Sequence, residues 1–139
     1  REVEIEIPEN SSVVLGEFKL EDIDKYKEFF YVKLYNEKGE LMDQNEYFFA
    51  PFKHLDLPDA VVVYNVEEIG ENSYLLNMES DFLSLWVALK LENAEWEDNF
   101  VNIYPKTKYS IKFKAPYSLK ELEDKLEIEG YNLKKVRKS

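Results

Sequence analysis

The sequence predicts an all-β protein built as a sandwich of short strands. Residues 96–105 have the pattern of a strand followed by a turn led by Pro105, and residues 108–114 alternate between apolar and polar side chains. Such period-two alternation is typical of a half-buried antiparallel strand. Short apolar segments of this kind recur at regular spacing through the second half of the chain, which favours a β-sandwich.

The first part of the chain predicts one strand at its start and a hairpin further on. Apolar and acidic residues alternate over residues 2–8, so we expect the sequence to begin inside a strand, as a piece cut from a larger protein would. Residues 29–35 predict a strong strand. Residues 36–39 predict the hairpin loop, in which Gly39 supplies a left-handed backbone.

A domain boundary follows the hairpin. Residues 46–50 predict a further strand that ends at Pro51, and residues 55–59 form a short bridging stretch. We therefore expect a first domain over residues 1–57 and a second over residues 58–139.

The second domain is predicted to contain five strands and then a single helix. The expected strands are residues 60–66, 74–79, 82–91, 99–104 and 108–114. Ser118 and Glu121 have the spacing of a capping box, and leucines recur at helical spacing until Gly130 supplies a stop. Residues 131–136 predict a final edge strand.

Composition and charge exclude several classes of function. The chain has 139 residues and a formal net charge of −11, which would repel the phosphates of nucleic acids and of anionic membranes. It has no cysteine, so disulfides, thiolate catalysis and cysteine-based zinc sites are excluded. We expect neither a nucleic-acid partner nor a membrane partner. The absence of cysteine also fits a reducing compartment, so we expect a cytoplasmic protein.

No arrangement of residues in the sequence predicts catalysis. Glu97 and Asp98 are adjacent, so on an extended segment they point to opposite faces and cannot flank one glycosidic bond. Asp98 and Asn99 are instead expected to satisfy backbone groups where the chain enters the next strand. The sequence therefore predicts no catalytic residues.

Metal and cofactor sites are also not expected. His54 is the only histidine and has no second histidine, serine or cysteine to pair with. The acidic residues between positions 22 and 28 lack the glycine and the ligand spacing of a calcium loop.

Exposed aromatic residues are the strongest candidates for binding, because aromatic rings can stack on the apolar faces of sugars. Trp96 and Tyr104 are the candidate carbohydrate-binding residues, although packing remains the favoured role for Trp96. Trp86 lies in the apolar run 82–89 and is predicted to belong to the core.

Two groups of motifs carry a family resemblance. Residues 30–55 resemble the end of the penultimate immunoglobulin-like domain of β-mannosidases of glycoside hydrolase family 2. The second half resembles their last immunoglobulin-like domain through the turn Glu79-Ser80-Asp81 and the run Asp98-Asn99-Phe100 that leads to Pro105. Members of this family commonly have glycine and glutamate after that proline, whereas this chain has Lys106 and Thr107. The turn there must therefore accept a residue with a side chain.

The resemblance implies an immunoglobulin-like sandwich with one short C-terminal helix, preceded by the later strands of an incomplete second immunoglobulin-like domain. It implies a parent enzyme that hydrolyses terminal non-reducing β-D-mannose residues with retention, using two glutamates of an upstream barrel domain. This chain would then be non-catalytic and would pack against the rest of the parent chain or against a second copy. The alternatives are a carbohydrate-binding module that uses exposed aromatic residues and, ranked third, an adhesion module.

Overall fold

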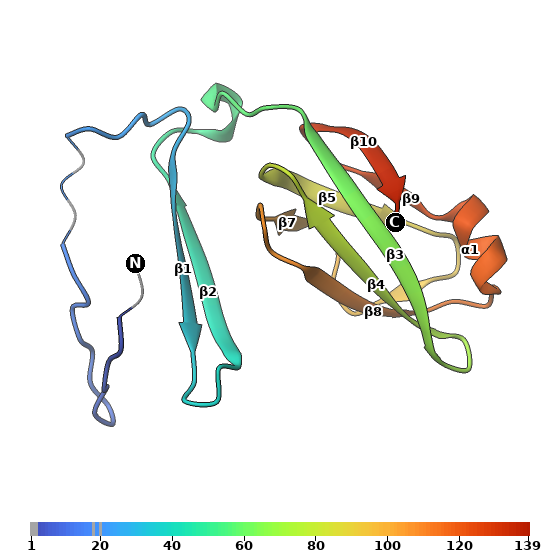
Figure 1. Cartoon of the computed structure of the whole chain (residues 1–139), viewed down its shortest axis with the longest axis horizontal. Coiled ribbons are helices and arrows are strands. Elements are labelled where there is room, and N and C mark those ends of the chain that lie inside the picture. The colour runs from blue at the N-terminus through green and yellow to red at the C-terminus, as the bar shows by residue number, and fades with distance from the viewer. Residues whose placement is uncertain (1–2, 18, 20) are drawn as a thin grey trace. The chain divides into compact units, whose positions relative to one another are not determined.

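The computed structural model describes residues 3–17, 19 and 21–139. Contacts divide the chain into two compact units, residues 1–56 and residues 57–139, which we call the N-terminal and C-terminal units. Each unit has its own sheets (Figure 1). The predicted all-β class is confirmed.

The N-terminal unit contains a β-hairpin. Strands β1 (Phe29–Tyr35) and β2 (Leu41–Phe48) pair antiparallel, from Phe29 opposite Phe48 to Tyr35 opposite Leu41 (Figure 1). A short 3₁₀ helix, η1 (Phe52–His54), follows. Gly39 has a φ of 77° in the connecting loop, which confirms the left-handed turn predicted there.

Asn36 organises this hairpin loop. Its side-chain oxygen accepts hydrogen bonds from the backbone N–H groups of Lys38 and Glu40, both at 2.9 Å. An asparagine that bonds to the backbone two residues further on is a common device for forming turns. The loop is therefore fixed by one side chain in addition to the glycine.

The strand predicted at residues 2–8 is wrong for the described part, residues 3–8, which form no strand; residue 2 lies outside the described residues. Alternation of apolar and acidic side chains suits a strand, but the backbone needs a neighbouring strand to bond with. In the described part of this unit, the only ladder joins β1 to β2. The return from the hairpin, expected at residues 40–42, and the strand expected at residues 46–50 form one continuous strand, β2, over residues 41–48.

Alternate residues of β1 leave an apolar stripe exposed. Phe30, Val32 and Leu34 are each exposed, and Tyr47 lies opposite Phe30 on β2. A hairpin of two strands is marginally stable by itself, and an apolar sheet face is normally covered by a second layer. Among the described residues, no second layer buries this stripe.

The C-terminal unit is a sandwich of two sheets. One sheet has five strands in the order β10-β3-β4-β8-β6, and the other has three in the order β7-β5-β9. The strands are β3 (Ala60–Gly70), β4 (Ser73–Ser80), β5 (Ser84–Lys90), β6 (Glu95–Trp96), β7 (Val101–Ile103), β8 (Tyr109–Lys114), β9 (Glu127–Glu129) and β10 (Leu133–Lys138). Strand β10 runs parallel to β3 at one edge of the larger sheet, and the other pairs are antiparallel. The predicted edge strand at the end of the sequence is confirmed.

The core of this unit lies between the two sheets. Leu76 and Ile111 of the larger sheet are fully or almost fully buried, as are Val87 and Ile103 of the smaller sheet. Along β4 and β8, the residues between these positions are more often polar, which is the alternation expected of sheets with one solvated face. Leu122 of the helix is also buried in this cluster.

Two short strands were absent from the prediction. Strand β6 has only two residues, too few for an alternating pattern to be visible. Strand β9 lies where the helix was expected to continue to Gly130. The helix α1 (Leu119–Lys125) ends earlier than expected, because Ile128 is buried opposite Leu89 of β5. Residues 127–129 therefore pair with β5 as a strand and do not continue the helix.

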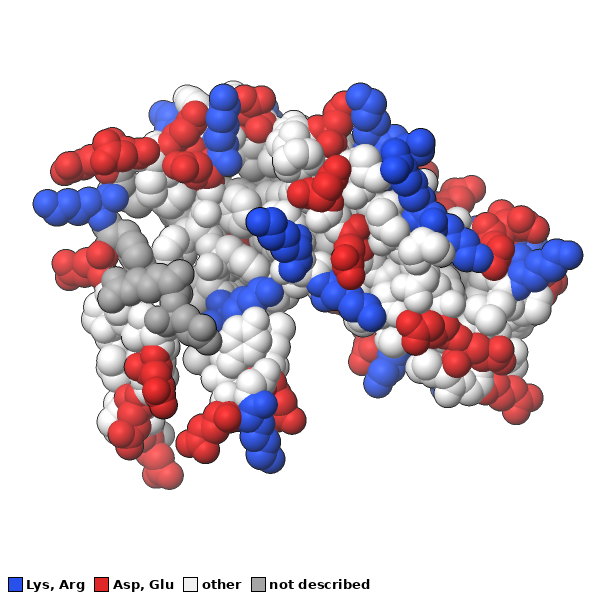
Figure 2. Space-filling view, viewed as in Figure 1, with Lys and Arg blue, Asp and Glu red and all other residues white. Residues whose placement is uncertain are grey.

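Acidic and basic side chains are interspersed over the face of the molecule that Figure 2 displays. Ion pairs such as those of Lys90 with Glu129 and of Lys134 with Asp59 join exposed side chains. Exposed pairs of this kind contribute little to stability, and we assign the fold to the apolar core.

A capping box begins α1, as the sequence predicts. Glu121 accepts hydrogen bonds from both the backbone N–H and the hydroxyl of Ser118 at 2.8 Å, and the N–H of Glu121 donates to the Ser118 hydroxyl at 3.4 Å. The hydrogen bonds from Ser118 lower the pKa of the Glu121 carboxyl below its ordinary value of 4.5. The first turn of the helix is therefore held by a reciprocal pair of side chains.

We predict that Ser118→Ala lowers the free energy of unfolding by about 1 kcal/mol, because it removes the cap of the helix. Urea denaturation of the 139-residue chain measures this loss. Lys120→Ala, an exposed change in the first turn of the same helix, is the control and should change stability by less than about 0.5 kcal/mol. Equal losses of unfolding free energy in the two variants would contradict the role of Ser118 as the helix cap.

The same box predicts a dependence on pH. A carboxyl whose pKa is lowered by folding contributes stability above its unfolded pKa, and this contribution is lost as the pH falls through the folded value. The cost of Ser118→Ala should therefore be smaller in acid than at neutral pH. The variant Glu121→Gln should remove this difference, which urea titrations at both pH values will show.

Candidate functional site

The two predicted carbohydrate-binding residues belong to opposite sheets. Trp96 is in β6, opposite Phe113 of β8, and its ring stacks on that of Phe113 with 4.4 Å between centroids and 27° between planes. Tyr104 follows β7 and is only 5% exposed. The structure does not assemble these two residues into one surface, and contact of either with a sugar stays a prediction.

Trp86 lies at the surface, so the prediction that it belongs to the core is wrong. The indole is 42% exposed, whereas its neighbours Leu85 and Val87 are fully buried. The register places Ser84 opposite Ile103 and Val87 opposite Val101, so two residues of β5 oppose one residue of β7. This arrangement is a β-bulge, and Trp86 has a φ of 53° within it.

A signal for this exposure was present in the sequence. Leu85, Val87 and Leu89 alternate with Trp86 and with Lys90, so period two alone assigns Trp86 to the face that carries the lysine. The apolar character of the whole run concealed this alternation. Ala88 lies on the outer face as well, and it is too small to mark that face as polar or apolar.

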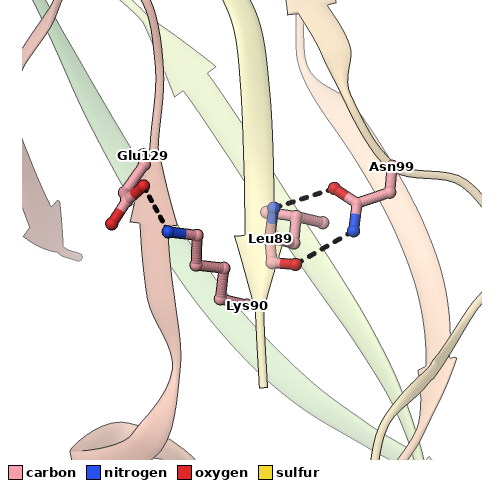
Figure 3. A network of polar contacts seen from close by, with 4 residues as sticks. All are labelled: Leu89, Lys90, Asn99 and Glu129. Atoms are coloured by element: carbon pink, nitrogen blue, oxygen red, sulfur yellow. Dashed lines mark hydrogen bonds and ion pairs between the residues drawn. The ribbon is translucent and has the colours of Figure 1, made fainter. Parts of the chain in front are cut away.

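The Asp-Asn-aromatic motif has a structural role. The backbone N–H of Leu89 donates to Asn99 Oδ1 at 2.8 Å, and Asn99 Nδ2 donates to the carbonyl oxygen of Leu89 at 2.9 Å (Figure 3). The side-chain amide thus makes the pair of bonds that a strand residue would make. Asp98 accepts from the N–H of Asn99 at 2.8 Å and from the Tyr109 hydroxyl at 3.1 Å. The expectation that Asp98 and Asn99 satisfy backbone groups is confirmed.

The turn Glu79-Ser80-Asp81 ties two strands together in a similar way. Asp81 Oδ1 accepts from the N–H of Val61 in β3 at 2.7 Å and from the N–H of Phe82 at 2.9 Å. The hydroxyl groups of Ser80 and Ser84 are 2.9 Å apart and buried. The motif fixes the crossing from the larger sheet to the smaller one.

The turn after Pro105 uses a left-handed residue that carries a side chain. Lys106 has a φ of 60°, and the N–H of Thr107 donates to the carbonyl oxygen of Tyr104 at 3.3 Å. This confirms the prediction that the turn accepts a residue other than glycine. A left-handed lysine costs some conformational strain, which the neighbouring strands must offset.

The perturbed pKa values belong to structural groups. Burial raises the pKa of Tyr74, whose hydroxyl donates to the carbonyl oxygen of Tyr117. The hydrogen bond to Glu129, at 2.5 Å, raises the pKa of Lys90 (Figure 3). The one carboxyl with a resolved shift among the described residues is that of Glu121 in the capping box. None of these groups forms the pair of carboxyls that a retaining glycosidase requires.

Candidate sites of other kinds are few. Within the described residues, no group of three or more histidine, aspartate or glutamate side chains could hold a metal ion. The same part of the chain contains no helix that is long and apolar enough to cross a membrane. An open concavity of about 400 Å³ lies along residues 46–52, and Glu46 is its one charged lining residue.

Two family models match the chain. Residues 1–54 match a Mannosidase Ig/CBM-like domain, and residues 57–132 match an Ig-fold domain of mannosidases. The second match covers more than half of the chain, so this chain belongs to the family of mannosidase Ig-fold domains. No curated protein matches the sequence.

Among solved structures, the chain is similar to the β-D-mannosidase from Dictyoglomus thermophilum. The identity is 82% and the TM-score is 0.85, over 97% of this chain. The match spans only 17% of the Dictyoglomus chain. These findings confirm the immunoglobulin-like fold and the resemblance to the immunoglobulin-like accessory domains of a family 2 β-mannosidase.

We predict that Asn99→Ala destabilises the C-terminal unit by about 1–3 kcal/mol, because it leaves the N–H and the carbonyl of buried Leu89 without partners. Urea denaturation of the 139-residue chain measures the loss. Asn65→Ala is the matched control, since the amide of Asn65 bonds to Glu67 in an exposed setting. An Asn99 variant no less stable than this control would show that water replaces the amide.

Proposed function

We propose that this chain is a non-catalytic accessory region of a β-mannosidase whose whole chain hydrolyses terminal non-reducing β-D-mannose residues with retention. The observation that carries the proposal is the 82% identity to the Dictyoglomus β-D-mannosidase over almost the full length of this chain. The one carboxyl with a perturbed pKa among the described residues, that of Glu121, caps a helix. The catalytic glutamates belong to another part of the parent enzyme.

The proposed role of the region is to pack against the remainder of the parent chain or against a second copy. The apolar stripe of Phe30, Val32 and Leu34 supports this proposal, because an exposed stripe on two strands gains stability when another layer covers it. The C-terminal unit has a closed core of its own and needs no such cover. The N-terminal unit is therefore the part that joins the region to its partner.

Carbohydrate binding is the second candidate function. An aromatic ring that is partly exposed can stack on a sugar while neighbouring polar groups bind its hydroxyls. Trp96 is half-buried and retains some accessible ring surface, and Tyr104 retains very little.

We predict that the purified 139-residue chain releases no product from p-nitrophenyl β-D-mannopyranoside above a buffer blank. The Dictyoglomus β-D-mannosidase, assayed under the same conditions, is the positive control. Turnover by the 139-residue chain would refute its assignment as an accessory region. In that case, single Glu→Gln changes would be needed to find the active carboxyls.

A further inference from the structure

We propose that Trp86 and Tyr131 form a binding platform for a neutral pyranose ring on the outer face of the three-stranded sheet. The two rings meet edge to face, with 5.1 Å between centroids and 64° between planes. Trp86 is 42% exposed and Tyr131 is 55% exposed. Together they offer solvent two aromatic surfaces set at an angle, which is a surface suited to stacking on a sugar.

The backbone holds both residues in place before any ligand arrives. The N–H of Trp86 donates to Asn102 Oδ1 at 3.1 Å, and the N–H of Tyr131 donates to the carbonyl oxygen of Leu85 at 2.9 Å. The β5–β9 ladder ends where Ala88 lies opposite Glu129, and the ring contact itself places Trp86 beside Tyr131 just beyond that end. One ring of the platform is therefore carried by strand β5, and the other by the turn between β9 and β10, which a backbone hydrogen bond ties to β5.

Trp86 adopts a conformation that folding alone does not favour. A φ of 53° is rare for a bulky residue, and asparagine or glycine would adopt it at lower cost. The same residue exposes a large apolar ring that adds nothing to the core. Strained residues of this kind gather at binding sites, and bulges commonly re-aim a side chain next to such sites.

The surroundings of the platform are polar. Asn102 lies opposite the bulge, and the exposed ion pair joins Lys90 of β5, the strand that carries Trp86, to Glu129 of β9, two residues before Tyr131. These groups supply donors and acceptors for sugar hydroxyls, in the combination of apolar surface and few polar groups that small-ligand sites use.

This polarity favours a sugar over a polypeptide as the occupant. An apolar protein surface pressed on the platform would bury the amide and the ion pair, which costs free energy unless each group finds a partner. A neutral oligosaccharide brings its own hydroxyls to those groups. The net charge of −11 repels anionic ligands and has no such effect on a neutral sugar.

The test uses the two tryptophans of the chain, Trp86 and Trp96. The 139-residue chain, labelled with ¹⁵N, gives one indole N–H signal from each in a two-dimensional NMR spectrum. Mannohexaose added to millimolar concentration should shift the Trp86 signal in a saturable way and leave the Trp96 signal unmoved. Trp86→Asn assigns the signals, because asparagine tolerates the left-handed backbone and removes the ring.

Trp86→Asn should weaken binding at least about tenfold, and Tyr131→Ala should weaken it several-fold, with the other amide signals unchanged in position. Trp96→Phe should bind as the unchanged chain does. The proposal is overturned if neither indole signal moves, if Trp96 alone moves, or if both platform variants bind as tightly as the unchanged chain. The measurement reads binding to this chain directly, so its result is independent of whether the parent enzyme hydrolyses mannosides.

Discussion

The hydrogen bonding of strand β5 is the constraint on which the C-terminal unit depends. This strand supplies Val87 and Leu89 to the core and lies at the centre of the smaller sheet, so its backbone must find partners on both sides. Strand β9 serves one side, but β7 on the other side has only three residues. The amide of Asn99 replaces the missing strand residue by bonding to both polar groups of Leu89. Without it, a buried peptide group would remain unsatisfied.

An asparagine also satisfies the bulge. Within the three residues of β7, Asn102 alone lies opposite both Leu85 and Trp86, and its side-chain oxygen accepts a hydrogen bond from the N–H of Trp86. The side chains of Asn99 and Asn102 thus supply hydrogen bonds to β5 that the backbone of the short strand β7 does not supply. The arrangement keeps Leu85 and Val87 buried and sends the intervening indole outward.

The sequence was sufficient for the class of fold because that class depends on side-chain period. Strands of six or more residues, such as β3 and β8, show the alternation of apolar and polar side chains directly, and the capping box predicts the start of α1. The strand β9 could not be predicted in the same way. Its three residues follow the helix without a break, and only the pairing of Ile128 with Leu89, a contact between distant segments, decides their conformation.

The candidate site shows where sequence reasoning is weaker. Trp96 was noticed for its polar neighbours, yet a two-residue strand places its ring on Phe113. Trp86 was assigned to the core for its apolar neighbours, although alternation along β5 predicts the outer face. The polarity of neighbouring residues indicates how exposed a whole segment is. The exposure of one side chain depends on which face of the sheet it occupies.

The two units differ in how completely they bury their apolar surface, and this difference bears on what each can do. In the C-terminal unit, both sheets contribute to one core, and β5, which carries the exposed ring of Trp86, also carries Lys90 of an exposed ion pair with Glu129. In the N-terminal unit, three apolar side chains are exposed at alternate positions of β1, Phe30, Val32 and Leu34, and Tyr47 lies opposite the first of them. A continuous stripe calls for another protein layer, while an isolated aromatic pair among polar groups suits a small polar ligand. Under the two proposals made above, the region joins its parent chain through the N-terminal unit and binds sugar on the C-terminal unit.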